Sequence, residues 1–188
     1  MSTYSTISAI PNTLARTTLV LGGTRSGKSN FAETLFEAWS SPVYIATAEA
    51  LDSEMKARIE AHRKARGGRW QTVEAPLELV SALLSYSKNG RPILVDCLSL
   101  WISNLLMAER VLDDEIALLL QSLPTLDSPV VFVSTEVGLG GIATNELARR
   151  YADALGTLHQ ALAAKVQRTY WVVAGISMLI NGEKTDDY

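Results

Sequence analysis

Cysteine is almost missing from this chain of 188 residues, in which Cys97 stands alone. A single cysteine cannot build an intrachain disulfide framework, so the simplest expectation is a reducing compartment, the cytoplasm. The chain has only two histidines and lacks the Cys/His spacing of a zinc site. Apolar residues make up 47% of the sequence, which is enough for the core of one domain.

A basic surplus and a long apolar run are missing as well. Lys and Arg number 17 against 20 Asp and Glu, a formal net charge of −3, which argues against a nucleic-acid binder. The longest uncharged apolar-rich stretch, residues 97–108, is too short and too polar to span a membrane. No basic segment followed by an apolar one opens the chain, so secretion is not expected.

The first sixteen residues, MSTYSTISAIPNTLAR, are rich in Ser and Thr and contain no acid. We expect a disordered or loosely attached leader over residues 1–16. Residues 17–188 suit one compact domain, because no boundary is visible after the leader.

Short apolar runs alternate with helical patterns from Thr17 onward. Several runs are continuous in Val, Ile and Leu, which is typical of strands buried on both faces of a parallel sheet. We expect strands at 17–23, 43–48, 70–75, 92–98, 129–137 and 169–175. Helices are expected over 28–39, 52–66, 77–87, 98–109, 113–123 and 144–166. This alternation predicts an α/β fold with a mostly parallel sheet flanked by helices.

The segment 22-GGTRSGKS-29 matches the phosphate-loop pattern G-x-x-x-x-G-K-[ST] between an expected strand and an expected helix. Its glycines allow close approaches that a Cβ would block, so the loop amides can converge on phosphate oxygens. Lys28 is expected to reach the β- and γ-phosphates, and the Ser29 hydroxyl to bind Mg²⁺. The sequence therefore predicts a nucleoside triphosphate site over Gly22, Gly23, Thr24, Arg25, Ser26, Gly27, Lys28 and Ser29.

Two acidic residues at strand ends are candidates for the rest of this site. Asp96 closes 93-ILVD-96, where it is expected to bind Mg²⁺; a cap for the following helix is the alternative. Glu136 closes 130-VVFVSTE-136, at the sheet edge where ligands bind in open α/β folds. For Glu136, a contact to metal, water or substrate stays open. The chain has no N-K-x-D segment, which disfavours a regulatory GTPase and leaves kinases, transferases and motors.

Basic residues surround His62 in 54-EMKARIEAHRKARGG-68. On a helix, Arg58, His62 and Arg66 share one face. Neighbouring cations disfavour the protonated imidazole, and a neutral imidazole beside a phosphate site can attack phosphorus to form a phosphoramidate. Spacing alone leaves the alternative of a solvated basic helix that happens to carry a histidine.

Seven motifs follow one another along the chain: 20-VLGGTRSGKS-29, 44-YIATA-48, 52-DSEMKARIEAHRKAR-66, 70-WQTVE-74, 94-LVDCLSLWISNLL-106, 133-VSTEVGLGGIATNELARRY-151 and 170-YWVVAGI-176. With them the chain resembles the bifunctional adenosylcobinamide kinase / adenosylcobinamide-phosphate guanylyltransferase family of cobalamin biosynthesis. The resemblance covers nearly everything from Thr18 to Ile176. It is far more specific than a phosphate loop alone.

This resemblance implies two activities. The family phosphorylates the aminopropanol hydroxyl of adenosylcobinamide with ATP or GTP, and then transfers GMP from GTP onto that phosphate through a covalent GMP-histidine. It implies a P-loop fold like that of RecA-type proteins and assembly as a homotrimer. The family histidine falls on His62, and Lys28 handles phosphate. Beyond the loop, the family's nucleotide contacts fall on Ala46, Thr47, Ala48, Arg63, Lys64, Ala65, Arg66, Glu74 and Asp96.

The sequence departs from the family pattern at a few positions. Ala61 stands where many members have a second histidine, so a helper role for that residue is absent or supplied elsewhere. Asp96 replaces the Glu of some members and is one methylene shorter. The region after Leu106 looks shorter than in some relatives, which puts their corrinoid contacts in doubt.

Three other functions remain as alternatives. They are a small-molecule kinase without guanylyl transfer, a RecA-like ATPase acting on nucleic acid, and a nucleotide-binding scaffold. The acidic balance speaks against the second. His159, beside the apolar stripe of the last long helix, is expected to be a structural or surface histidine. The glycine-containing loop 137–146 suits a substrate lid or an ordinary connector.

Overall fold

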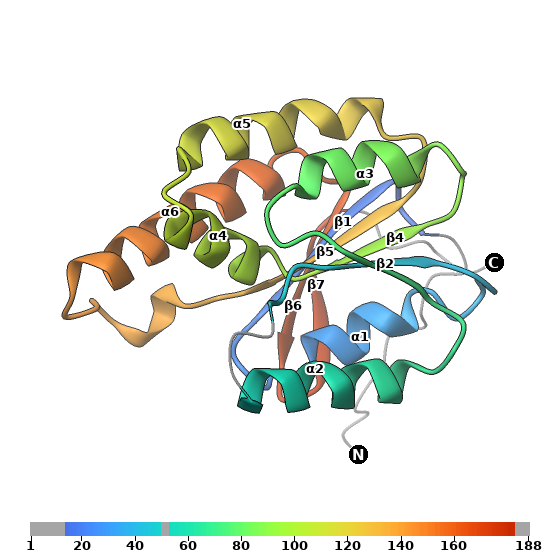
Figure 1. Ribbon diagram of the computed structural model, residues 1–188, viewed down its shortest axis with the longest axis horizontal. Coiled ribbons are helices and arrows are strands. Elements are labelled where there is room, and N and C mark those ends of the chain that lie inside the picture. Colours follow the sequence, from blue (N-terminus) through green and yellow to red (C-terminus); the bar gives the residue numbers. More distant parts are fainter. Residues whose placement is uncertain (1–13, 50–52, 183–188) are drawn as a thin grey trace, which may run out of the picture.

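Seven strands form one sheet in the computed structural model, which describes residues 14–49 and 53–182 (Figure 1). Their order across the sheet is β3-β2-β4-β5-β1-β6-β7, with β1 to β6 parallel and β7 antiparallel to β6. The strands are β1 (Thr17–Gly22), β2 (Val43–Ala46), β3 (Gln71–Glu74), β4 (Ile93–Asp96), β5 (Val130–Thr135), β6 (Arg168–Val173) and β7 (Ile176–Asn181). The expected α/β fold with a mostly parallel sheet is confirmed.

Helices cover both faces of the sheet (Figure 1). One face carries α1 (Lys28–Thr34) and α2 (Ser53–Arg66). The other carries α3 (Leu79–Ser87), α4 (Leu98–Met107), α5 (Leu112–Ser122) and α6 (Glu146–Ala163). Short 3₁₀ turns, η1 (Leu123–Thr125) and η2 (Gly138–Gly140), precede and follow β5. Within the described ranges, no helix is both long enough and apolar enough to cross a membrane.

Two apolar cores result from the alternation of side chains along the strands. On β5, Phe132 packs in the core under α3 to α6, whereas Val131 and Val133 pack in the core under α1. Trp101 is fully buried in the larger core, and its indole N–H donates to the Leu77 carbonyl at 2.9 Å. Helices cover both faces of the central strands, which explains why these strands have continuous apolar runs.

Most of the expected leader, residues 1–13, lies outside the described residues. Of its last three residues, Leu14 packs against the smaller core. Arg16 donates from its guanidinium to the Leu126 carbonyl and from its backbone N–H to Gln167 Oε1, both at 2.6 Å. The chain is therefore anchored to the domain just before β1.

One strand was not expected, and a predicted strand ends early. The run 169–175 was expected as a single strand, but β6 stops at Val173 and the chain reverses into β7. Ala174 and Gly175 both have positive φ, 52° and 80°, as a two-residue hairpin turn requires. The apolar Ile176 and Ile180 face solvent on this edge strand, so its pattern does not mark a buried face.

Candidate active site

The phosphate loop connects the end of β1 to the start of α1 as a tight backbone cradle. A Cβ on Gly22 would lie 2.5 Å from the Val172 carbonyl oxygen, so only glycine fits there. Gly27 has φ 92°, in the left-handed region that favours glycine. The turn between β6 and β7 supports the loop, because the Gly175 N–H donates to the Ser26 carbonyl at 2.8 Å.

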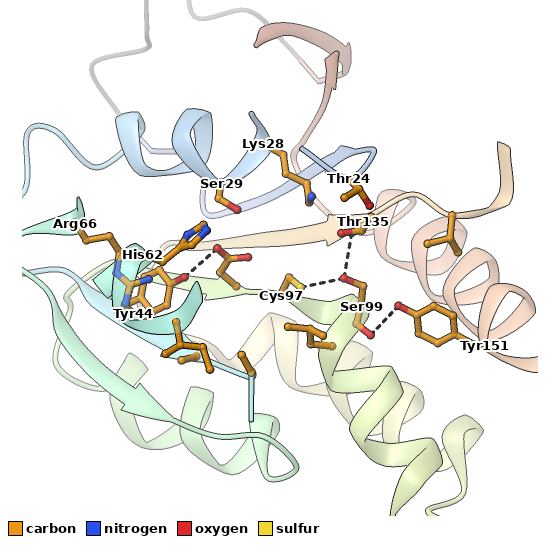
Figure 2. Close-up of a pocket in the computed structure, with 16 residues that line it drawn as sticks. Thr24, Lys28, Ser29, Tyr44, His62, Arg66, Cys97, Ser99, Thr135 and Tyr151 are labelled. Atoms are coloured by element: carbon orange, nitrogen blue, oxygen red, sulfur yellow. Dashed lines mark hydrogen bonds between the residues drawn. The ribbon is translucent and has the colours of Figure 1, made fainter. Parts of the chain in front are cut away.

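A pocket of about 290 Å³ opens beside this loop at the carboxyl ends of the strands (Figure 2). Its position agrees with the general rule for open α/β sheets. Sixteen residues from six regions of the chain line it: Thr24, Lys28, Ser29, Tyr44, Ala46, Ala48, Ile59, His62, Arg66, Asp96, Cys97, Ser99, Leu100, Thr135, Val137 and Tyr151.

Lys28, His62 and Arg66 line the pocket from the phosphate loop and α2, and we call this part of the lining the phosphate half. Figure 2 shows the His62 ring close to Ser29, whereas the Lys28 side chain ends beside Thr24 and Thr135. Arg66, one helical turn after His62, places its guanidinium carbon 3.5 Å from the centre of the Tyr44 ring, a cation–π distance. Two of the three residues expected on one helix face, His62 and Arg66, therefore line the pocket, whereas the Arg58 side chain lies outside the described part.

Asp96 lies in the same half and is held by Tyr44. The Tyr44 hydroxyl donates to Asp96 Oδ2 at 2.9 Å. Burial raises the pKa of Tyr44, and the neighbouring Asp96 charge raises it further, so the phenol stays a hydrogen-bond donor at neutral pH. Tyr44 on β2 thus fixes the orientation of the Asp96 carboxylate at the end of β4.

Ser29 and Asp96 provide hard oxygen donors of the kind that Mg²⁺ prefers. The described residues hold no cluster of three or more His, Cys, Asp or Glu that would form a metal site from protein alone. This donor set fits Mg²⁺, which commonly binds through one or two protein oxygens together with phosphates and water.

The rest of the lining has no charged side chain, and we call it the neutral half: Cys97, Ser99, Leu100, Thr135, Val137 and Tyr151. The Tyr151 hydroxyl donates to the Ser99 carbonyl at 3.1 Å, and the Thr135 N–H donates to Ser99 Oγ at 3.3 Å. Burial raises the pKa of Tyr151 to about 12 and that of the Cys97 thiol to about 11. Both groups are therefore protonated at neutral pH.

Of the residues expected to be catalytic or to bind nucleotide, eight line the pocket and others do not. The lining residues are Thr24, Lys28, Ser29, Ala46, Ala48, His62, Arg66 and Asp96. Thr47 is fully buried, where its hydroxyl donates to the Cys97 carbonyl at 2.7 Å and accepts from the Cys97 N–H at 2.9 Å. Arg63, Lys64 and Glu74 are exposed and lie outside the pocket wall. The side chain of Ala65 lies outside the described part.

Glu136 does not line the pocket but forms a cluster with α6. Its carboxylate accepts from the Gly138 N–H and lies 3.5 Å from His159 Nδ1. His159 Nε2 lies 2.7 Å from the Ser134 hydroxyl, and both residues are buried. Burial lowers the pKa of His159, and this effect outweighs the attraction of the Glu136 charge. As expected, His159 is a structural histidine.

Comparison with known proteins gives a family for this arrangement. Residues 18–180 match the family model described as cobinamide kinase / cobinamide phosphate guanyltransferase. The chain belongs to this family. It is 47% identical to the bifunctional adenosylcobalamin biosynthesis protein CobP of Pseudomonas aeruginosa, an alignment that covers 88% of this chain and 97% of that protein. It is 37% identical to the bifunctional protein CobU of Salmonella typhimurium, covering 86% and 98%.

A solved structure from Pyrococcus horikoshii shares only the fold. Its TM-score is 0.53 at 8% sequence identity, and the alignment covers 92% of this chain and 89% of that one. At this identity the likeness concerns the arrangement of strands and helices alone. The assignment to the cobinamide kinase / guanyltransferase family therefore rests on the family model and the sequence relatives, and not on this solved structure.

Sequence reasoning did not single out the pocket roles of several residues: Tyr44, Ile59, Cys97, Ser99, Leu100, Thr135, Val137 and Tyr151. A signal was present, because all eight fall within the motifs that carry the resemblance to this family. Thr135 is also the last residue of β5, and Val137 follows two residues later. Both therefore lie at the carboxyl edge of the sheet, where ligand contacts are expected.

Proposed function

We propose that this protein is a bifunctional enzyme that phosphorylates adenosylcobinamide and then guanylylates the product. One observation supports both activities: His62 lines the same pocket as Lys28, Ser29 and Asp96. A nucleophile and a phosphate site within one pocket let a bound GTP react at its terminal phosphorus or at its α-phosphorus.

In the kinase step, the aminopropanol oxygen forms a bond to the γ-phosphorus of ATP or GTP, and the β,γ-bridge breaks. The nucleoside diphosphate leaves, and the hydroxyl proton passes to an oxygen of the transferred group and then to water. Lys28 and the loop amides hold the phosphates and stabilise their charge. Ser29 and Asp96 would hold Mg²⁺, which neutralises charge on the phosphate oxygens.

In the guanylyl step, a neutral His62 nitrogen forms a bond to the α-phosphorus of GTP, and pyrophosphate leaves. The proton on the other ring nitrogen stays, so the imidazole can leave again in neutral form. An oxygen of the corrinoid phosphate then attacks the same phosphorus, the P–N bond breaks, and adenosylcobinamide-GDP forms. Arg66 beside His62 stabilises the added negative charge in both displacements. Covalent catalysis of this kind divides one difficult transfer into two.

Two labelled nucleotides distinguish this function from a plain small-molecule kinase. The purified protein is incubated with adenosylcobinamide, Mg²⁺ and either γ-labelled ATP or α-labelled GTP with unlabelled ATP. The bifunctional enzyme transfers both labels to the corrinoid and releases pyrophosphate with the second. If only the γ-label reaches the corrinoid, the protein is a kinase alone.

We also propose a homotrimer in the cytoplasm. The edge strand β7 supports assembly, because Ile176, Met178 and Ile180 expose a row of apolar side chains that a monomer would leave in water. The single free cysteine supports a reducing compartment. Light scattering tests the assembly: a trimer has three times the 20.4 kDa chain mass, and a particle of one chain mass contradicts it.

A further inference from the structure

The neutral half of the pocket has no part in holding a triphosphate. Its six lining residues carry hydroxyl, thiol and apolar groups, whereas Lys28, Arg66 and His62 belong to the phosphate half. Lys28 ends where the two halves meet, beside Thr135 (Figure 2). A polyphosphate needs cations or loop amides around it. The neutral half therefore suits an uncharged group that is partly apolar and partly hydrogen-bonding.

The neutral half lies beyond the place that the terminal phosphate of a bound nucleotide would occupy. Thr135 ends β5, which lies between the phosphate-loop strand β1 and the Asp96 strand β4. Figure 2 shows Thr135 between Lys28 and Ser99, at the junction of the two halves. Because the lysine of a phosphate loop reaches the β- and γ-phosphates, a group in the neutral half approaches the nucleotide from its terminal phosphate.

The hydrogen bonds within the neutral half leave one hydroxyl available. Ser99 accepts from Thr135 through its side chain and from Tyr151 through its backbone. Among the described residues, nothing hydrogen-bonds to the Thr135 hydroxyl itself. Leu100 and Val137 add apolar groups to the lining of this half.

An exposed apolar loop continues from the same wall. Residues 137–151 leave the pocket at Val137 and return to it at Tyr151. Between them, Leu139 and Ile142 are 80% and 91% exposed. Apolar side chains in water at the rim of a pocket favour a ligand whose body is larger than the pocket and partly apolar.

We propose that the neutral half is the acceptor subsite: it takes the alcohol arm of the corrinoid, Thr135 Oγ1 hydrogen-bonds the arm's terminal oxygen, and Leu139 and Ile142 contact the macrocycle outside. This inference rests on the proposed function, since the acceptor of that reaction is the ligand. In the kinase step the Thr135 hydroxyl accepts from the arm's O–H and directs its oxygen toward the γ-phosphorus. The macrocycle stays outside because the pocket is too small for it.

Three variants test the subsite, and the acceptor-free reaction provides the internal control. Val137→Trp fills the neutral half, Thr135→Val removes a hydroxyl without changing shape, and Ile142→Asp charges the loop. Leu118→Asp charges an equally apolar, exposed position on α5 and is the matched control. For each folded variant, covalent enzyme-GMP formation without acceptor is measured alongside KM for adenosylcobinamide and for GTP.

If the neutral half is the acceptor subsite, the variants should impair only the reaction with adenosylcobinamide. We expect Val137→Trp and Ile142→Asp to raise KM for adenosylcobinamide by about 10-fold or more, with enzyme-GMP formation within about 2-fold of the wild type. Thr135→Val should lower kcat/KM for adenosylcobinamide by about 10-fold, the effect of losing one hydrogen bond. Leu118→Asp should change neither.

Other outcomes overturn the subsite. If the variants raise KM for GTP instead, the neutral half holds the nucleoside. If Ile142→Asp alters the particle mass in light scattering and not the acceptor KM, the loop contacts a second copy of the chain. If the wild type forms neither enzyme-GMP nor phosphorylated corrinoid, the proposed function itself fails, a result separable from any failure of the subsite.

Discussion

The two histidines have opposite surroundings, and these decide what each can do. His62 is exposed on α2 and lines the pocket, so it can meet a phosphorus atom. His159 is buried between Ser134 and Glu136, where no ligand reaches it. The sequence distinguished the two histidines by their neighbours, because basic residues surround His62 and apolar residues surround His159. It could not identify Ser134 and Glu136 as partners, since those contacts join β5 to α6.

Burial of His159 gives a prediction about stability and pH. The pKa of His159 in the folded protein lies below its usual value of 6.5, so the folded state resists protonation more than the unfolded state. This contribution to stability is present above about pH 6.5 and is lost progressively as the pH falls below it. We expect urea denaturation to show a smaller loss of stability from pH 7.5 to 5.5 for His159→Gln than for the wild type. Equal losses would contradict the assignment.

The hydrogen bond from Tyr44 to Asp96 makes Tyr44 a positioning residue for the metal-side carboxylate. In Tyr44→Phe the ring that packs against Arg66 remains, and only the donor to Asp96 Oδ2 is lost. We expect kcat of the kinase step to fall by about 10-fold, as for a lost hydrogen bond to a charged group, and half-maximal activity to require more Mg²⁺. An unchanged Mg²⁺ dependence would show that Asp96 keeps its position without Tyr44.

At the scale of elements, α4 is tied to the segments after β2 and β3 by polar contacts that the apolar stripe did not reveal. The stripe predicted the helix and its buried face, including Trp101 and Leu105. Asn104 lies within that buried face and donates to the Thr47 and Pro76 carbonyls at 2.7 and 3.0 Å. An asparagine in an amphipathic pattern suggests a surface residue, so only the structure shows that Asn104 joins α4 to the segments after β2 and β3.

Loss of this amide should destabilise the fold. Asn104→Ala leaves two carbonyl groups without a donor in a buried place, which costs about 1–3 kcal/mol. The free energy of unfolding in urea measures the effect. Gln121→Ala on the exposed side of α5 removes an amide of the same kind and should cost little. If both variants lose equal stability, the Asn104 contacts are not what holds α4 in place.

The strand β7 shows where pattern reasoning fails at this scale. Strand prediction relies on apolar residues facing a core, yet the apolar side of β7 faces out. Gly175 was a usable sequence signal, because glycine readily adopts the positive φ, 80° here, that a two-residue hairpin turn requires. Its contact with the phosphate loop through Ser26 could not have been foreseen from local sequence.

For the whole molecule, the sequence predicted the fold class and the position of the phosphate half, because both follow from local patterns. Continuous apolar runs indicated buried parallel strands, and the glycine loop predicted a nucleotide site at their carboxyl ends. The neutral half was not predicted as a compartment. It forms where α4, β5 and α6 meet, and residues as distant as Ser99 and Tyr151 become neighbours only after folding.

Nucleotide binding should stabilise the entire domain, since the loop joins β1 to α1 at the centre of the sheet. Mg²⁺–GTP at about 100 times its dissociation constant adds about 2.7 kcal/mol, which raises Tm by roughly 5–11 °C for a chain of this size. Lys28→Met should abolish this shift. Lys88→Met, at an exposed position after α3, should retain it. A full shift in Lys28→Met would mean that GTP binds elsewhere.

The central claim is that His62 bonds to the α-phosphorus of GTP. The most direct measurement incubates the protein with α-labelled GTP and Mg²⁺ in the absence of corrinoid, and then tests the protein for covalent label. We predict a label that acid releases and base does not, present in His159→Gln and absent in His62→Ala. No label at any Mg²⁺ concentration, or a label that survives in His62→Ala, would contradict the account.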